Sequence, residues 1–312
     1  MRICVTGGNG MIGTCIKNLT NFYINDQFIF LSHNTLDLTN REKVFQYFNS
    51  NHFDAIIHLA ADVGGLYKNI NNNITMFNNN IAMNQNILEA AYKNNIKKGI
   101  FCLSSCIYTP NPNKFPMDET MIHIGPPHIS NEGYAYAKRM LEIQCKNYNK
   151  AYGTSYICVI PVNLYGPYDN YSLENGHIIP MILHRFYKEQ LNNNIIAYGT
   201  GKPLRQFLYN YDFAKIICNI ITNDIILNTE PIIICNDQEY TIKTVVEKIS
   251  DTMNIPKNKI IWDTTKSDGC YRKTVSNNKF KTMFPNFKFT SLDEGLHTTY
   301  KWFTLTYPNI RM

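Results

Sequence analysis

The chain has 312 residues, 44% of them hydrophobic, so it can bury one large core or a core with a smaller companion domain. Its nine cysteines are scattered without paired short spacings, which argues against a disulfide framework or a structural zinc site and favours a reducing, cytoplasmic location. No apolar stretch approaches the roughly 18 residues of a membrane span, and the +6 formal charge is spread along the chain, unlike the basic block typical of nucleic-acid binding.

Short apolar runs alternate with helix-length segments through the first half of the chain. The runs predict strands at 3–6, 28–31, 55–59, 99–103 and 156–160, and the segments between them predict helices near 11–24, 40–50, 74–95 and 132–152. Alternation of this kind favours parallel strands joined by crossover helices. We therefore expect an α/β fold with a doubly wound parallel sheet.

The pattern loosens after residue 161. The second half predicts a loop at 163–176, a helix at 177–192, a strand at 203–209, a helix at 211–223, a strand from about 232, a helix at 241–253, a short strand at 259–262 and a C-terminal helix. Ser291 and Glu294 form a capping-box pattern at the start of that last helix. Two asparagine runs, at 71–73 and 78–80, lie in or beside a helical pattern, and we expect them to be solvated.

A glycine cluster follows the first predicted strand and opens the first predicted helix. Its sequence is Thr6-Gly7-Gly8-Asn9-Gly10-Met11-Ile12-Gly13. In a dinucleotide site the first glycine permits a tight turn, the second lets the backbone approach the pyrophosphate, and the third lets helix and strand pack closely. Amides at the helix N-terminus then face the phosphates. The alternative is a glycine-rich turn without a ligand.

Residues after the second and third strands are candidates for the rest of a nucleotide site. Asp37 lies where an acidic residue can approach the adenosine end, or else it is a turn or helix-cap aspartate. The small residues of Leu59-Ala60-Ala61 leave room for a cofactor or fill the core equally well. No arginine follows the glycines, so the residues alone leave both NADP and NAD open.

Four polar residues follow the next strand or lie on the next helix. Tyr134 and Lys138 are four apart and share a helix face, so we expect the ammonium to lower the pKa of the phenol and make it a proton donor near neutral pH. Ser104 ends a strand, where ligands of parallel sheets gather, and can bind a substrate carbonyl together with Tyr134. Cys106 is either a buried structural cysteine or a base that reaches the same pocket.

These motifs resemble the extended short-chain dehydrogenase/reductases that act on nucleotide sugars. The run Ser104-Ser105-Cys106-Ile107-Tyr108 narrows the resemblance to the GDP-L-fucose synthase family, and the segments 118–128, 163–170, 176–180, 204–208 and 266–269 agree with it. The resemblance extends from end to end of the chain. It implies conversion of GDP-4-keto-6-deoxy-D-mannose to GDP-L-fucose, by 3,5-epimerisation followed by NADPH-dependent reduction at C4.

The resemblance also implies roles for individual residues. Ser104, Tyr134 and Lys138 would form the reducing triad, with Cys106 and His177 as the epimerising base and acid. The implied cofactor contacts are Gly7, Gly8, Asn9, Gly10, Met11, Ile12, Gly13, Asp37, Leu38, Leu59, Ala60, Ala61, Leu103, Ser104, Tyr134, Lys138, Pro161, Val162, Asn163, Leu164 and His177. The implied substrate contacts are Ser105, Cys106, Asn163, Arg185, Tyr198, Arg205, Lys266 and Asp268, with the arginines countering the diphosphate charge.

Two positions depart from the family pattern. Tyr198 lies where the family often has tryptophan, which keeps an aromatic ring for stacking but changes its size. Asn9 lies where some members have an arginine that contacts the cofactor phosphate. NADP(H) is therefore implied by the resemblance and not by a residue, and NAD(H) is not excluded.

At the level of the whole chain we expect two domains. A Rossmann domain would comprise 1–163 plus about 206–236, and a smaller α/β substrate domain about 164–205 plus 237–312. The resemblance implies a homodimer in which the helices 74–95 and 132–152 pair into a four-helix bundle. The alternatives are another NAD(P)-dependent nucleotide-sugar epimerase, dehydratase or reductase, which has no evident need for both Cys106 and His177, and an inactive NAD(P)-binding sensor, which needs no intact triad.

Overall fold

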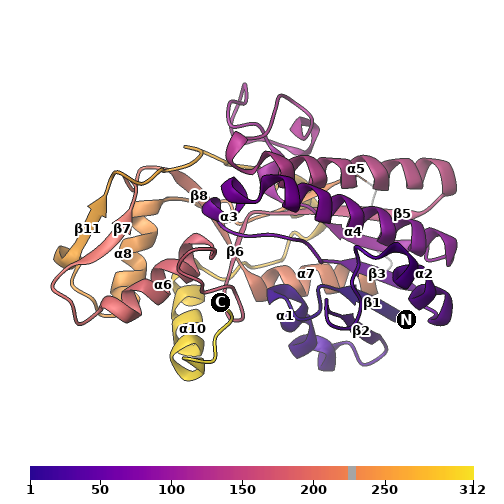
Figure 1. The fold of residues 1–312 in the computed structure, drawn as a ribbon, viewed down its shortest axis with the longest axis horizontal. Helices are drawn as coiled ribbons and strands as arrows, with labels where there is room; N and C mark the ends of the chain where they lie inside the picture. Colours follow the sequence, from indigo (N-terminus) through magenta and orange to yellow (C-terminus); the bar gives the residue numbers. More distant parts are fainter. Residues whose placement is uncertain (224–229) are drawn as a thin grey trace.

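The computed structural model describes residues 1–223 and 230–312 and contains a six-stranded sheet in the order β2-β1-β3-β4-β5-β9 (Figure 1). The strands are β1 (Arg2–Thr6), β2 (Gln27–Leu31), β3 (Ala55–His58), β4 (Lys98–Cys102), β5 (Ser155–Pro161) and β9 (Ile232–Ile234). Every neighbouring pair is parallel. The predicted doubly wound parallel sheet is confirmed, and its order reverses between β1 and β3, which is where ligands of such sheets bind.

Helices cover both faces of this sheet. They are α1 (Met11–Leu19), α2 (Arg41–Ser50), α3 (Leu66–Asn71), α4 (Asn73–Lys93), α5 (Glu132–Tyr152) and α7 (Asn210–Thr222). The long helices α4 and α5 pack together on one face, and α1 packs against α7 on the other (Figure 1). The predicted helix 11–24 ends early, because a 3₁₀ turn, η1 (Thr20–Phe22), takes over where the Thr20 hydroxyl donates to the Lys17 carbonyl. No helix within the described ranges is both long and apolar enough to cross a membrane.

Within the described residues, the second half of the chain also forms two small sheets and four α-helices besides α7. The strands β6 (Asn163–Tyr165), β8 (Leu204–Tyr209) and β10 (Glu239–Thr241) form one sheet, and β7 (Ile195–Tyr198) and β11 (Ile260–Asp263) form the other. The helices are α6 (Ile178–Glu189), α8 (Ile242–Thr252), α9 (Asn278–Met283) and α10 (Leu292–Thr306). In Figure 1, β7, β11, α6, α8 and α10 lie to the left of the six-stranded sheet.

Two clusters of buried apolar side chains underlie this arrangement. The first contains the strands of the six-stranded sheet, and β3 is buried along its whole length, as a strand covered on both faces must be. The second joins α6, α8 and α10 to β7 and β8. Strand β8 contributes to both, because Leu208 packs in the first cluster while Phe207 and Tyr209 pack in the second.

Two local predictions in this half have different outcomes. The capping box is confirmed: the Glu294 amide donates to the Ser291 hydroxyl over 3.2 Å, and the Ser291 amide donates to the Glu294 carboxylate over 3.1 Å. The predicted loop at 163–176 is wrong at its start. Residues Asn163–Tyr165 form β6 because they pair in parallel with Phe207–Tyr209 of β8, far away in the sequence.

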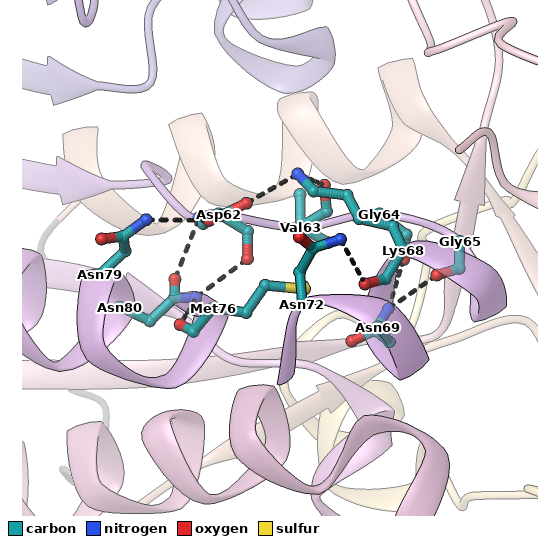
Figure 2. Close-up of polar contacts among 10 residues, drawn as sticks. All are labelled: Asp62, Val63, Gly64, Gly65, Lys68, Asn69, Asn72, Met76, Asn79 and Asn80. Atoms are coloured by element: carbon teal, nitrogen blue, oxygen red, sulfur yellow. Dashed lines mark hydrogen bonds and ion pairs between the residues drawn. The ribbon is translucent and has the colours of Figure 1, made fainter. Parts of the chain in front are cut away.

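The expectation that both asparagine runs are solvated is wrong for Asn80. Asn80 is fully buried, and its side chain bonds both backbone groups of Asp62 (Figure 2). Its Nδ2 also donates to the carbonyl of Met76, one turn earlier in α4. The expectation fails here because a buried amide is stable once each of its groups has a partner, and the connection after β3 supplies those partners.

All nine cysteines are free thiols. Burial raises the pKa of Cys218 to about 12 and that of Cys102 to about 11, so both are protonated at neutral pH and pack as small apolar groups. Cys106 differs from them, because its pKa lies below the usual value of a thiol.

Candidate active site

The glycine turn between β1 and α1 has the geometry that its sequence predicts. Gly7 has φ +70°, and a Cβ there would lie 2.9 Å from the Ala60 nitrogen, so no other residue fits. A Cβ on Gly13 would lie 2.5 Å from the Gly7 carbonyl oxygen. The backbone therefore folds tightly at the start of α1, whose N-terminal amides are available to an anion.

One cavity of about 910 Å³ brings most of the predicted site residues together. It is lined at the carboxyl ends of four neighbouring strands: by the glycine turn after β1, Leu59 to Ala61 after β3, Leu103 to Cys106 after β4, and Pro161 to Leu164 at the end of β5. All of the predicted cofactor and substrate contacts line it except Gly8, Arg185 and Lys266.

The three exceptions lie just behind the lining. Gly8 packs on β2, where a Cβ would lie 2.7 Å from the Cβ of Phe30, so packing requires a glycine there. Arg185 stacks on the ring of Tyr198 with its guanidinium 3.8 Å from the ring centroid, and the Lys266 ammonium lies 5.7 Å from the same centroid. Tyr198 itself faces the cavity.

Asp37 marks one end of the cavity. Its carboxylate accepts hydrogen bonds from the hydroxyl and amide of Thr39, which lower its pKa, so both interpretations of this residue apply: it shapes a turn and it faces the cavity. The sequence reasoning missed Lys17, whose ammonium donates to the side chain of Asn9, a lining residue, over 2.8 Å. Lys17 is one helical turn beyond Gly13, a spacing that could have identified it.

Tyr134 and Lys138 lie on the face of α5 toward the cavity, and both are buried. The Lys138 ammonium donates to the Cys102 carbonyl over 2.7 Å and lies 5.8 Å from the centroid of the Tyr134 ring. The expected lowering of the phenol pKa is wrong. Burial raises the pKa of Tyr134 well above its usual value, as does the nearby thiol of Cys106, while a hydrogen bond to Ser104 only opposes the rise.

The thiol of Cys106 lies in the 3₁₀ turn η2 (Ser105–Ile107), which follows β4 and is capped by Ser104. The Ser104 hydroxyl accepts a hydrogen bond from the Cys106 amide over 3.2 Å. Lys273, which the sequence reasoning missed, places its ammonium 3.8 Å from the sulfur. Burial works to raise the pKa of Cys106, but Lys273, Ser104, His177 and Asn131 together outweigh it, so the pKa lies below its usual value.

His177 caps α6 on the same cavity and has a buried acidic partner. Its Nδ1 lies 3.9 Å from a carboxylate oxygen of Asp169, a residue that is only 3% exposed. Burial works to lower the pKa of His177, but the Asp169 carboxylate outweighs it and raises the pKa above the usual value. The imidazole is thus disposed to carry a proton while the thiol is disposed to lose one.

The far end of the cavity contains Tyr198, Arg205 and Asp268. The Arg205 guanidinium donates to the carbonyls of Leu204 and Cys270, which fixes it against the loop after β11. Asp268 accepts hydrogen bonds from the amide and hydroxyl of Thr200, over 2.7 and 2.6 Å, and so closes the loop after Tyr198. Cations and an aromatic ring thus surround this end.

Comparison with known proteins agrees with this geometry. Residues 3–234 match the model of the NAD dependent epimerase/dehydratase family. The GDP-L-fucose synthase of Dictyostelium discoideum is 41% identical over 99% of this chain and 97% of its own length, and the probable GDP-L-fucose synthase of Drosophila melanogaster is 37% identical over 99% of each. The crystal structure of a GDP-L-fucose synthetase from Naegleria fowleri bound to NADP superposes with a TM-score of 0.91 and 38% identity, covering 100% of this chain and 95% of that one. The chain therefore belongs to the NAD dependent epimerase/dehydratase family and, within it, to the GDP-L-fucose synthases.

Proposed function

We propose that this chain converts GDP-4-keto-6-deoxy-D-mannose to GDP-L-fucose, by epimerisation at C3 and C5 followed by NADPH-dependent reduction at C4. The relatives named GDP-L-fucose synthase support the overall reaction. The observation that carries the proposal is that the Cys106 thiol, the His177 imidazole and the Tyr134 phenol all face one cavity beyond the glycine turn. A nucleotide-sugar enzyme of another kind would have no evident use for both Cys106 and His177.

Epimerisation uses the acidity of the carbons on either side of the C4 ketone. A proton leaves C3 or C5 only if the resulting enolate is stabilised, and hydrogen bonds from Ser104 and Tyr134 to the C4 oxygen would supply that stabilisation. The Cys106 thiolate removes a proton from one face of the ring, and His177 returns one to the other face. The opposite pKa shifts of these two groups suit a base and an acid in the same cavity.

Reduction acts on C4, the carbon of the same ketone. The glycine turn fits a cofactor pyrophosphate, because the close backbone approaches at Gly7 and Gly13 fold it tightly and leave the N-terminus of α1 on the cavity. Asp37 would bind the adenosine end, with Lys17 bonded to Asn9 of the turn. NADPH supplies a hydride to C4 when bound. Tyr134 gives its phenolic proton to the C4 oxygen, and the raised pKa of Tyr134 keeps that proton in place until the oxygen becomes basic. Lys138 fixes this end of the cavity through its bond to Cys102.

The GDP part of the substrate would occupy the end lined by Tyr198. Its ring, stacked on Arg185, offers a face to the guanine, and Arg205 counters the diphosphate charge. The remaining assigned contacts are Ser105, Asn163, Lys266 and Asp268. The NADP-bound relative supports NADP(H) as the cofactor.

The two-domain organisation remains part of the proposal. The Rossmann domain would comprise 1–163 and about 206–236, and the substrate domain about 164–205 and 237–312. The existence of two apolar clusters supports this division, although Val275 and Phe280 pack in the first cluster. The cavity would then lie between the two domains, with the cofactor on one and the GDP portion on the other.

A homodimer through a four-helix bundle of α4 and α5 is supported by exposed apolar side chains on α5, at Met140, Ile143 and Tyr152. Light scattering on the purified protein tests the dimer, and Ile143→Glu is expected to yield monomers.

A location in the cytoplasm is supported by the nine free thiols.

Incubation with a panel of nucleotide sugars tests the reaction. We expect GDP-4-keto-6-deoxy-D-mannose with NADPH to give GDP-L-fucose, identified by NMR, and we expect UDP- and dTDP-linked 4-keto sugars to give little product. A parallel reaction with NADH measures the cofactor preference. Turnover of a UDP- or dTDP-sugar in preference to the GDP-sugar would show that the enzyme acts on a different substrate.

A further inference from the structure

The connection between β3 and α4 is bound by side chains along most of its length. Asn80 accepts from the Asp62 amide over 3.1 Å and donates to the Asp62 carbonyl over 2.9 Å, so one buried side chain satisfies both backbone groups of one residue (Figure 2). The Asp62 carboxylate in turn binds the ammonium of Lys68 over 2.7 Å and the amide of Asn79 over 3.0 Å. Asp62 is therefore fixed by contacts from both α3 and α4.

The two glycines that follow are fixed in the same way. The Asn69 side chain donates to the Gly64 carbonyl over 2.7 Å and to the Gly65 carbonyl over 2.9 Å, and Asn69 is only 7% exposed (Figure 2). The backbone of residues 62–65, here called the 62–65 segment, accepts or donates hydrogen bonds with side chains of α3 and α4 at Asp62, Gly64 and Gly65. It can therefore act as a fixed support.

The 62–65 segment supports the loop that ends at His177. The Gly65 amide donates to the Asn175 carbonyl over 2.9 Å. A Cβ on Gly65 would lie 2.3 Å from the Gly176 carbonyl oxygen, far inside van der Waals contact. Gly65 has φ −67°, which any residue adopts, so the need for glycine comes from this approach and not from backbone conformation.

We infer that Gly65 is a positioning residue for epimerisation: through its contact with Asn175 and Gly176, the 62–65 segment places the His177 imidazole opposite the Cys106 thiol. The inference rests on the proposed function, in which His177 returns the proton that Cys106 removes from the other face. Gly65 and His177 line the same cavity. The reducing groups Ser104 and Tyr134 line it too, but Ser104 caps η2 and Tyr134 lies on α5, outside this contact.

Displacement of His177 has a chemical consequence that can be measured as a ratio of products. If the acid is misplaced, deprotonated substrate regains its proton on the original face. Hydride from NADPH and the proton of Tyr134 then reduce the unchanged ketone, giving a GDP-6-deoxyhexose that keeps the substrate's configuration at C3 and C5 and so remains a D sugar. The ratio of this product to GDP-L-fucose does not depend on how much of the protein is folded, so a loss of stability alone would not change it.

Gly65→Ala tests the inference, with Ile70→Ala as the control. Ile70 follows Asn69 in α3, is 51% exposed, and its side chain takes no part in the bonds that hold the 62–65 segment. We expect Gly65→Ala to lower the rate of inversion at C3 and C5, measured as GDP-L-fucose formed, by about 10²-fold, the scale of a misplacement of ~1 Å, and to shift products toward the unepimerised sugar. Ile70→Ala should keep the wild-type ratio.

A second variant guards against a failure of Gly65→Ala to fold. Asn69→Leu removes the two bonds to the Gly64 and Gly65 carbonyls and adds no atom near Gly176, so it should shift the product ratio in the same direction but less. Wild-type product ratios in Gly65→Ala, or in Asn69→Leu should Gly65→Ala not fold, would overturn the inference and leave the proposed function intact. A wild-type enzyme that forms no GDP-L-fucose would instead refute the proposed function.

Discussion

Two residues with opposite pKa shifts define the chemistry at the smallest scale. The pKa of Cys106 is lowered, because Lys273, Ser104, His177 and Asn131 together outweigh its burial. The pKa of His177 is raised, because Asp169 and Cys106 together outweigh its burial. A base works above its own pKa and an acid below its own. Solvent exchange at C3 and C5 should therefore rise with pH as Cys106 loses its proton and fall as His177 loses its proton.

Lys273→Met should move the rising limb of that profile to higher pH. The Lys273 ammonium, 3.8 Å from the sulfur, stabilises the thiolate, and without it the burial of Cys106 raises the pKa. The measurement is deuterium incorporation followed by NMR across the pH range. Lys281→Met removes an equal charge at an exposed site paired with Asp237 and should leave the limb in place. A limb that does not move in Lys273→Met would refute the role of this lysine.

Tyr134→Phe should slow reduction more than epimerisation. Loss of the proton donor should cost about 10²–10⁴-fold in the rate of NADPH oxidation. Exchange at C3 and C5 should continue at a reduced rate, because Ser104 still binds the ketone oxygen. A Phe variant that reduces at the normal rate would show that Tyr134 is not the proton donor.

In the wild type, the raised pKa of Tyr134 predicts that reduction loses no activity through phenol ionisation as the pH rises toward 9.

At this scale the sequence identifies the reactive groups but not the residues that tune them. Tyr134 and Lys138 follow from helical spacing, and Cys106 and His177 follow from the family resemblance. Lys273 is 167 residues from Cys106 in the sequence, and no local pattern marks it. The same is true of Asn80, whose side chain bonds the backbone of Asp62 in the connection after β3. Such partners become visible only when the fold brings them together.

At the scale of elements, local patterns predict what local interactions determine. The strand, glycine turn and helix that begin the chain are confirmed because their geometry depends on neighbouring residues. The capping box of α10 is confirmed for the same reason. Strand β6 was missed because it exists through pairing with β8, about forty residues later, and the short helix α3 was missed because six residues show little periodicity.

Gly13→Ala tests the glycine turn as a unit. A Cβ at Gly13 would lie 2.5 Å from the Gly7 oxygen and 2.7 Å from the Gly8 Cα, so the turn must open and its amides must leave their positions. We expect NADPH affinity to fall by at least about tenfold, or ~1.4 kcal/mol, as measured by titration of NADPH fluorescence. GDP affinity, which depends on the Tyr198 end, should be unchanged in the same variant. Unaltered NADPH affinity in a folded variant would contradict this account of the turn.

At the scale of the whole molecule, the six-stranded parallel sheet follows from the alternating pattern, while the two small sheets could not be assembled from sequence. Strand β7 was not predicted at all, and β11 pairs with it about sixty residues away. Residue contributions to both ends of one cavity likewise come from widely separated segments. Non-local pairing of this kind leaves no periodic signal in a single chain.

Hydrogen exchange with each ligand tests the proposed division into two domains. NADPH should slow amide exchange in the glycine turn and around Asp37, because those amides would face the cofactor. GDP should slow exchange around Tyr198 and between 263 and 272, where Arg205 and Asp268 are held. Protection of the glycine turn by GDP alone would contradict the assignment of the two ends.

The most direct test of the central claim is a single reaction in D₂O. GDP-4-keto-6-deoxy-D-mannose and NADPH are incubated with the enzyme, and the product is analysed by NMR. The account predicts GDP-L-fucose with deuterium at C3 and C5 and with protium at C4, delivered as hydride. A reduced product that keeps the D configuration and contains no deuterium at C3 or C5 would contradict the claim that one cavity carries out both epimerisation and reduction.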